Sequence, residues 1–212
     1  MIIAIDGPAA AGKGTLARKL AAHYGLSYLD TGSLYRAVGH ALLEAGIDPH
    51  DARAAAEAAR KLDLSGIDDK NLRSAEAGEA ASVVSVNPQV RAALLQFQRD
   101  FAAKAPGAVL DGRDIGTVVA PHADIKLFVT ASTKERAHRR WLELKDRGEE
   151  VDEAQIRADI EKRDARDSGR ASAPLKMAED AHLLDTTKLD IEAAFHMAVS
   201  LIDDALDGGV SR

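Results

Sequence analysis

Short apolar runs alternate along the chain with longer stretches whose apolar positions recur with the period of a helix. The short runs are typical of buried strands, and they lie at residues 2–5, 27–29, 108–110, 125–129 and 182–184. The helical pattern starts near Lys13 and recurs at residues 34–45, 51–62, 87–103, 134–147, 153–167 and 191–206. This alternation predicts an α/β fold, in which helices flank a parallel sheet of five strands.

Polar turns follow four of the predicted strands. Right-handed crossovers bring the carboxyl ends of parallel strands to one edge of a sheet, where α/β folds bind their ligands. The sequence therefore predicts one ligand site built from these turns, which read Asp6-Gly7, Asp30-Thr31-Gly32, Asp111-Gly112-Arg113-Asp114 and Asp185-Thr186-Thr187.

A chain of 212 residues can bury one full core, so we expect a single domain over residues 1–212. Residues 46–87 interrupt the rhythm with alanine-rich helix pieces around a polar stretch at 65–71, which predicts an insert. Arginines crowd residues 134–169, where we expect a lid. The core then comprises about residues 1–45, 88–133 and 170–212.

Composition narrows the class of protein. The net charge of −6 argues against general binding to nucleic acid or to anionic membranes. The absence of cysteine excludes disulfides and thiolate zinc sites, and the seven histidines lack metal-ligand spacing. The apolar N-terminal run is too short for a signal sequence, and no apolar run is long enough to span a bilayer. We therefore expect a cytoplasmic protein, and a monomer because no exposed apolar repeat suggests an interface.

The first predicted strand runs into Gly7-Pro8-Ala9-Ala10-Ala11-Gly12-Lys13-Gly14-Thr15. Gly-x4-Gly-Lys arises by chance in about 6% of chains of this length, but a strand before it and a helix after it favour a phosphate-binding loop. In such a loop, backbone amides surround a polyphosphate and Lys13 reaches its terminal phosphates. Thr15 is the expected magnesium ligand, with Asp111 a weaker candidate acting through water.

Two further turns are candidate anion sites. Arg113 and Asp114 follow a strand and can project into the cleft, although a surface turn with a local ion pair would look the same. Thr31 or Ser33 can cap the next helix, with Arg36 on its first turns. That pattern predicts a second anion site or plain helix capping.

Arg163, Asp167 and Arg170 share one face of a predicted helix that ends at Gly169 and Pro174. A solvated ion-pair face uses the same spacing. The position beside a hinge instead favours a lid that closes over a triphosphate. Upstream arginines repeat the pattern at Arg136, Arg139, Arg140 and Arg147, and we assign Arg139 to the ATP site.

Five blocks of sequence together resemble the bacterial-type cytidylate kinases, of the nucleoside monophosphate kinase family, over nearly the whole chain. They begin at Ile5, Leu29, Asp111, Glu135 and Arg163, and read IDGPAAAGKGT, LDTGSLYR, DGRDIGTVV, ERAHRR and RDARDSGRASAPL. The resemblance implies a phosphate-binding-loop fold with a nucleotide-binding insert and an arginine-rich lid. It also implies phosphorylation of CMP and dCMP by direct in-line transfer from ATP with Mg²⁺.

The resemblance also implies residue roles. Thr31, Arg36, Arg113 and Arg163 would bind the phosphate of CMP. Ser82, Arg91 and Asp114 would read the cytosine edge, and Asp167 and Arg170 would contact the sugar. Tyr35 lies near the second anion site and could pack on the ligand. Catalysis would depend on Lys13, Arg113 and Arg163.

The insert departs from the family pattern, because family members carry hairpin-rich sequence where this chain has residues 63–73 with little strand character. Two alternatives stay open. The protein could be a kinase for another monophosphate such as UMP, or a nucleotide-binding sensor without catalysis.

Overall fold

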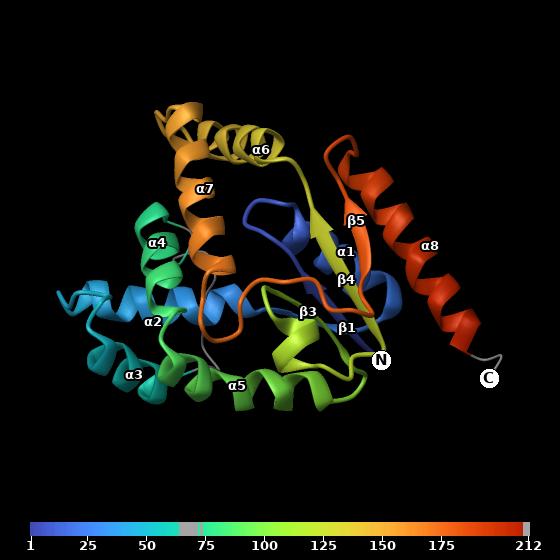
Figure 1. Cartoon of the computed structure of the whole chain (residues 1–212), viewed down its shortest axis with the longest axis horizontal. Helices are drawn as coiled ribbons and strands as arrows, with labels where there is room; N and C mark the ends of the chain where they lie inside the picture. Colours follow the sequence, from blue (N-terminus) through green and yellow to red (C-terminus); the bar gives the residue numbers. More distant parts are fainter. Residues whose placement is uncertain (64–71, 73, 210–212) are drawn as a thin grey trace.

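A computed structural model describes residues 1–63, 72 and 74–209. One parallel sheet lies at its centre, with the strand order β2-β3-β1-β4-β5 (Figure 1). The strands are β1 (Ile2–Asp6), β2 (Ser27–Asp30), β3 (Ala108–Gly112), β4 (Ile125–Thr130) and β5 (His182–Asp185). The α/β fold and all five predicted strands are confirmed.

The register of the strands brings the polar turns together. Asp6 at the end of β1 pairs with Gly112 on β3, and Asp30 at the end of β2 pairs with Asp111. These strands therefore end side by side at the same edge, as the sequence predicts, and the candidate site starts from that edge.

Helices cover both faces of the sheet. On one face, α1 (Lys13–Tyr24) and α8 (Ile191–Gly209) bury Leu16, Leu20 and Ile202 against β1, β3, β4 and β5. On the other face, α5 (Pro88–Ala103) packs with a π-helical turn, η1 (Ile115–Val119). The sequence pattern did not predict η1.

A second layer of helices lies beyond the end of the sheet. α2 (Thr31–Glu44), α3 (Ala52–Lys61) and α4 (Ala75–Val84) pack with α5 around their own apolar cluster. α6 (Thr133–Asp146) and α7 (Glu153–Ser168) form a separate cluster, and α7 runs from α6 down to α4 (Figure 1).

The alanine-rich pieces of residues 46–87 are the helices α3 and α4. The small side chains of α4 allow it to pack closely on α2. A Cβ on Gly39 of α2 would lie only 2.8 Å from the Cβ of Ala80 on α4. The polar stretch at 65–71, and most of the departure from the family pattern at 63–73, lie outside the described residues. None of the helices that the structure describes is long and apolar enough to cross a membrane.

The start of α2 differs from the prediction. Asp30 is the N-cap residue, and neither Thr31 nor Ser33 caps the helix. Thr31 Oγ1 instead donates to the carbonyl oxygen of Asp111 over 2.8 Å, and Ser33 Oγ donates to the carbonyl oxygen of Asp30 over 2.6 Å. The paired ends of β2 and β3 place a carbonyl beside Thr31, so its hydroxyl ties two strands together.

Candidate functional site

The loop between β1 and α1 depends on two glycines. Gly7 has φ 149°, and a Cβ there would lie 1.9 Å from the carbonyl oxygen of Val129 on β4, so no larger residue fits. Gly12, with φ 86°, is the N-cap of α1 and provides no side chain to bind the first amides. These amides and the positive end of α1 therefore favour an anion at the loop.

Lys13 is buried at the centre of this loop. Its Nζ donates to the carbonyl oxygen of Pro8 over 2.8 Å and lies 3.9 Å from Oδ1 of Asp111. Burial, and then the charge of Arg113, lower the pKa of Lys13 to about 8. Burial raises the pKa of Asp111 to about 6, although Lys13 opposes that shift. A polyphosphate beside Lys13 would restore a charged ammonium group.

Gly14 leaves space beside the Asp111 carboxylate, because a Cβ on Gly14 would lie 3.2 Å from Asp111 Oδ2. Thr15 is exposed and lines the neighbouring cavity. Within the described ranges, no group of three His, Cys, Asp or Glu residues could hold a metal ion. A magnesium ion here would take most ligands from nucleotide phosphates and water, as magnesium usually does. Asp111 and Thr15 are oxygen ligands of a suitable kind for the remaining positions.

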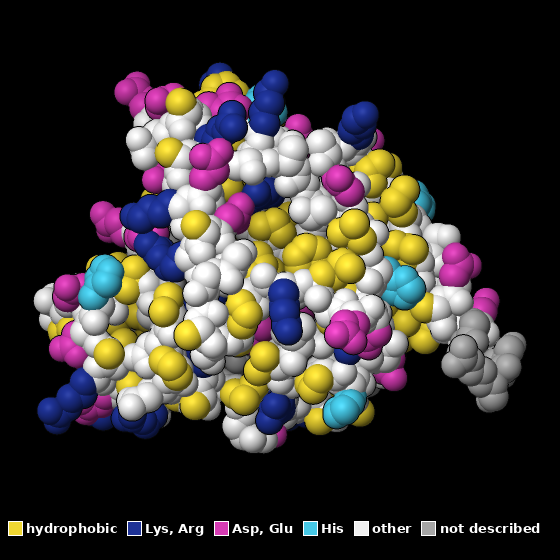
Figure 2. All heavy atoms as spheres, viewed as in Figure 1, with side chains coloured by type: hydrophobic (Ala, Val, Ile, Leu, Met, Phe, Trp, Pro, Cys, Tyr) yellow, Lys and Arg dark blue, Asp and Glu magenta, His cyan; other side chains and the backbone are white. Residues whose placement is uncertain are grey.

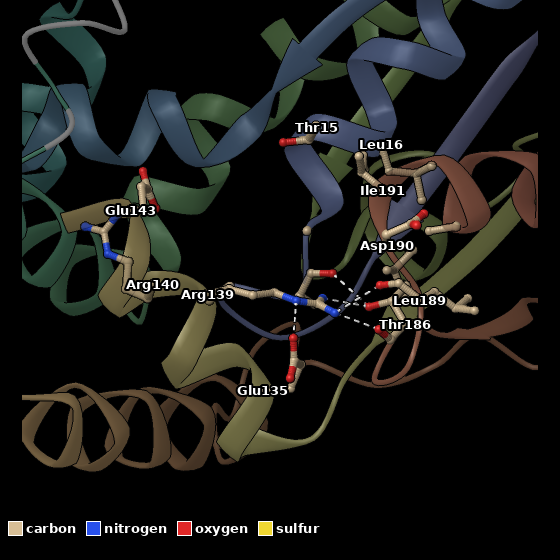
Figure 3. Close-up of a pocket in the computed structure, with 15 residues that line it drawn as sticks. Thr15, Leu16, Glu135, Arg139, Arg140, Glu143, Thr186, Leu189, Asp190 and Ile191 are labelled. Carbon is tan, nitrogen blue, oxygen red and sulfur yellow. Dashed lines mark hydrogen bonds and ion pairs between the residues drawn. The ribbon is translucent and has the colours of Figure 1, made fainter. Parts of the chain in front are cut away.

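A cavity of about 490 Å³ adjoins the loop, between α1, α6 and the start of α8. Figure 3 shows Arg139 reaching from α6 toward Thr186. Its guanidinium donates to Thr186 Oγ1 over 3.0 Å and to the Thr186 carbonyl over 2.7 Å, while Nε donates to Glu135 over 2.9 Å. Arg139 thus ties α6 to the loop after β5, and it lines the cavity next to the phosphate-binding loop.

Three further arginines lie on α6 and at its C-terminal cap, and one of them, Arg140, also lines the cavity. Arg136 is buried, and it donates to the carbonyl oxygens of Ala131 and Ala9 and to Asp164 of α7. Arg136 therefore holds α6 and α7 against the loop between β1 and α1. The sequence predicted Arg136 only as one of the lid arginines. Arg140 and Arg147 both pair with Glu143 on α6.

A second cluster of cations lies on the β2 and β3 side of the edge. Arg36 pairs with Asp30 over 2.7 Å, and Arg113 pairs with Asp167 over 2.9 Å. Arg163 comes to the same place from α7, but its buried Nε has no hydrogen-bond partner among the described residues. Burial, and then the charge of Arg113, lower the pKa of Arg163 to about 10. The cluster thus combines three arginines with two carboxylates, and a phosphate is an anion that could bind to the arginines as well.

Arg91 of α5 and Asp114 form a buried ion pair beside this cluster. Arg91 also donates to the carbonyl oxygen of Ser85 over 3.2 Å, and its guanidinium lies 5.5 Å from the ring centre of the buried Tyr35. Burial raises the pKa of Tyr35, so the phenol stays neutral. Donors, an acceptor carboxylate and an aromatic ring are thus combined in one place, as recognition of a nucleobase requires.

Arg170 lies beyond the end of α7, where the chain turns at Gly169. Its Nε donates to the carbonyl oxygen of Asp167 over 3.1 Å, so Arg170 stays close to Asp167 although the helical spacing no longer applies. The predicted set Arg163, Asp167 and Arg170 therefore meets Arg113 at the sheet edge and is not a solvated surface face.

Asp6 and Arg166 lie at the site and make contacts that the sequence pattern did not indicate. Asp6 accepts from the backbone amides of Ile115 and Gly116, each over 2.7 Å, and so fixes the turn that carries Asp114. Burial raises the pKa of Asp6 to about 6, although these two amides oppose the shift. Arg166 of α7 donates to Ser82 Oγ over 2.6 Å. The strand end placed Asp6 at the ligand edge, and Arg166 belongs to the block that begins at Arg163, but neither pattern indicated the partners that these side chains bind.

Comparisons with known proteins cover nearly the whole chain. The model of the family described as "Cytidylate kinase" matches residues 3–204. A protein of Rhodopseudomonas palustris named cytidylate kinase is 62% identical over 203 residues, which is 96% of each chain. A protein of the same name from Methylocella silvestris is 62% identical over 98% of this chain and 96% of its own. The fold is similar to the crystal structure of an uncharacterized protein from Eubacterium ventriosum, with a TM-score of 0.57 and 18% identity over 96% of this chain and 98% of that one.

Proposed function

Because the chain belongs to the cytidylate kinase family, it phosphorylates CMP and dCMP with ATP, and we propose that the two cation clusters at the sheet edge hold the two nucleotides. The observation that carries the assignment is Arg163, a partly buried arginine beside Arg113 whose buried Nε has no partner among the described residues. A phosphate oxygen would give this nitrogen a partner, and Arg163 is close enough to the phosphate-binding loop for its charge to act on Lys13.

The acceptor phosphate binds to Thr31, Arg36, Arg113 and Arg163 in this proposal. Arg113 and Arg163 approach from different elements, the turn after β3 and the helix α7, and their forks can hold phosphate oxygens from two sides. Arg36 remains near Asp30, which keeps its guanidinium directed at the same edge. Three fixed cations would place the phosphate in one orientation, which is the main catalytic requirement of phosphoryl transfer.

The base binds among Ser82, Arg91 and Asp114. An ionised Asp114 accepts hydrogen bonds only and suits the exocyclic amino group of cytosine, which uracil lacks. Arg91 donates and suits the ring acceptors. Tyr35 supports the guanidinium of Arg91 from below and so shapes the site. Asp167 and Arg170 contact the sugar.

The donor binds along Gly7, Pro8, Ala9, Ala10, Ala11, Gly12, Lys13, Gly14 and Thr15, with Arg139 from α6. Magnesium bound with ATP would neutralise charge across the β- and γ-phosphates. Thr15, and Asp111 through water, would hold the ion. Lys13 takes the same phosphates from the other side, and its contact with Pro8 keeps the ammonium group inside the loop.

The reaction needs no general base. An oxygen of the CMP phosphate attacks the γ-phosphorus of ATP, the bond to the bridging oxygen of ADP breaks, and CDP forms. The second pKa of a phosphate is about 6, so the attacking oxygen is already an anion at neutral pH. Lys13, Arg113 and Arg163 stabilise the negative charge as it moves from ATP to CMP.

The other parts of the assignment remain proposals. Residues 46–87 form the insert that covers the acceptor, and residues 134–169 form the lid over the donor. A cytoplasmic location and a monomeric state also stay predictions. The relatives' names agree with CMP as substrate, and no observation on the described residues favours UMP or a sensor without catalysis.

An ADP-release assay with ATP, magnesium and one acceptor at a time tests the function. The acceptors are CMP, dCMP, UMP, AMP and shikimate. We expect turnover to be fastest with CMP and dCMP. Preference for UMP or another acceptor would overturn the assignment of the base site, and nucleotide binding without any turnover would indicate a sensor.

A further inference from the structure

Arg166 connects two elements that approach the acceptor site from different sides. Its guanidinium donates to Ser82 Oγ over 2.6 Å and to both carboxylate oxygens of Glu79, over 2.7 and 3.2 Å. Ser82 and Glu79 belong to α4, whereas Arg166 belongs to α7. Figure 2 shows basic side chains next to acidic ones over these two helices, whose places are given in Figure 1.

Two further hydrogen bonds connect the backbone of this segment to Arg91. Ser85 Oγ donates to the carbonyl oxygen of Ser82 over 2.9 Å, and the carbonyl oxygen of Ser85 accepts from Arg91. Arg91 in turn pairs with Asp114. Ser82, Arg91 and Asp114 are therefore joined through Ser85, and Arg166 binds the one hydroxyl among them. Ser82 is 2% exposed, so its hydroxyl has little water to exchange partners with.

We propose that Arg166 is a positioning residue for pyrimidine selection, because its hydrogen bond to Ser82 orients the Ser82 hydroxyl as a donor to the base. The inference rests on the proposed role of Ser82 in reading the base. A serine hydroxyl can donate or accept, and it rotates to suit its neighbours. When Oγ accepts from a guanidinium, the hydroxyl hydrogen turns away from that cation and is left for an acceptor atom.

The orientation matters because cytosine and uracil differ in their hydrogen-bonding atoms. Ring atom N3 is an acceptor in cytosine and carries a hydrogen in uracil. A hydroxyl that is fixed as a donor forms a hydrogen bond with N3 of cytosine. With uracil the same hydroxyl meets the N3 hydrogen, and two buried donors that face each other without an acceptor are costly. A freely rotating hydroxyl would accept from uracil and discriminate less.

Glu79 keeps Arg166 in place. Its carboxylate binds the guanidinium, and this bond, opposed by partial burial, lowers the pKa of Glu79 below its usual range. Lys162 of α7 approaches the same carboxylate at 3.6 Å but makes no contact with Ser82. Lys162 is therefore a matched control, since it shares the helix, the charge and the acidic partner without the hydroxyl.

The test compares kcat/KM for CMP and UMP in Arg166→Met, Ser82→Ala, the double variant and Lys162→Met. We expect Arg166→Met and Ser82→Ala each to lower the CMP to UMP ratio by about tenfold, mainly through KM for CMP. The double variant should lose no more than either single one, since both remove the same oriented donor. Lys162→Met should keep the ratio within about twofold, and KM for ATP should stay unchanged in all four.

Two results would overturn the inference in different ways. If Ser82→Ala lowers the ratio and Arg166→Met does not, Arg166 does not orient the hydroxyl and the proposed base site stands. If neither changes the ratio, Ser82 does not read the base and that part of the proposed function is wrong. The inference would also be overturned if Arg166→Met lowered the CMP to UMP ratio as much in the Ser82→Ala background as in the native protein. Arg166 would then act independently of the Ser82 hydroxyl. Should Arg166→Met fail to fold, Glu79→Gln replaces it, with an expected loss of about threefold.

Discussion

Arg113 donates from Nε to Oδ2 of Asp167 over 2.9 Å, and this bond joins the turn after β3 to the last turn of α7. Burial opposes ionisation of Asp167, but Arg113, Arg163 and Arg170 outweigh it and lower its pKa. The carboxylate of Asp167 therefore interacts electrostatically with all three arginines. Its hydrogen bond goes to Arg113, and the Nε of Arg163 is left buried without a partner within the described part of the chain.

Arg163→Met should therefore stabilise the protein without ligand while weakening its response to CMP. The substitution removes a partly buried cation that repels Arg113, so the melting temperature should rise by about 2–4 °C, equivalent to ~1 kcal/mol in a chain of this size. The further rise caused by CMP should shrink, because the phosphate loses a partner. Thermal melts with and without CMP check both effects. Arg157→Met, on the exposed side of α7, should change neither, and an equal response to CMP in the two variants would contradict the phosphate role.

Lys13→Ala should lower turnover by about 10²- to 10³-fold with the fold intact, because a fixed cation beside the transferred phosphoryl group is lost. ADP release measures turnover, and circular dichroism checks the fold. Lys19→Ala is the control, since Lys19 lies on the same helix and pairs with Glu192 at the surface. Near-normal turnover in Lys13→Ala would be incompatible with the phosphate-binding loop assigned here.

The lowered pKa of Lys13 predicts a pH dependence. The ammonium group of the free enzyme is charged below about pH 8 and neutral above it. Because only the charged form attracts phosphate, kcat/KM for ATP should fall as pH rises through about 8. In kcat the decline should move to higher pH, since bound triphosphate favours the charged form. Lys13→Arg should lack the decline, because a guanidinium stays protonated. If kcat/KM for ATP in Lys13→Arg still fell as pH rises through about 8, the decline would come from a group other than Lys13.

Asp114→Ala should weaken the use of CMP far more than the use of ATP. The variant loses the acceptor for the cytosine amino group and leaves Arg91 without its buried partner, so kcat/KM for CMP should fall about 100-fold. KM for ATP should change by less than about twofold. Steady-state kinetics with each nucleotide varied in turn decide the matter, with the exposed Asp100→Ala as control. Equal losses for both nucleotides would indicate a structural role.

Two glycines that look alike in the sequence should respond in opposite directions to alanine. Gly39→Ala places a Cβ 2.8 Å from that of Ala80 and should destabilise the protein by about 1–3 kcal/mol, since α2 and α4 must move apart. Gly78 lies within α4, and a Cβ there would point into open space. Gly78→Ala should therefore stabilise the protein by about 0.5–1 kcal/mol. Urea unfolding measures both values. If Gly39→Ala left the free energy of unfolding unchanged, α4 would have moved to make room for the new Cβ. The CMP to UMP ratio should then fall, because Ser82 lies on α4.

Much of the fold and of the site was predictable from local pattern. Short apolar runs predicted the five strands. Right-handed crossovers between parallel strands then predicted that Asp6, Asp30 and Asp111 lie at one edge of the sheet. The loop around Lys13 was recognisable because its glycines, strand and helix are contiguous. These features depend on neighbours in the sequence, which is why a sequence is sufficient to find them.

Contacts between distant residues were decided only by the tertiary structure. Thr31 looked like a helix cap, but its hydroxyl reaches a carbonyl 80 positions away. Gly112 belongs to a predicted polar turn, yet it lies within β3, where a Cβ would lie 2.6 Å from Thr31 Oγ1. Arg166 and Ser82 are 84 positions apart.

The physical reason for this division is that each local element is chosen by its own residues, whereas the partner of a buried polar group is chosen by packing. The sequence by itself determined the strands, the phosphate-binding loop and the family. The structure decided which carboxylate serves which arginine, left the Nε of Arg163 for an anion, and set Arg166 against the hydroxyl of Ser82.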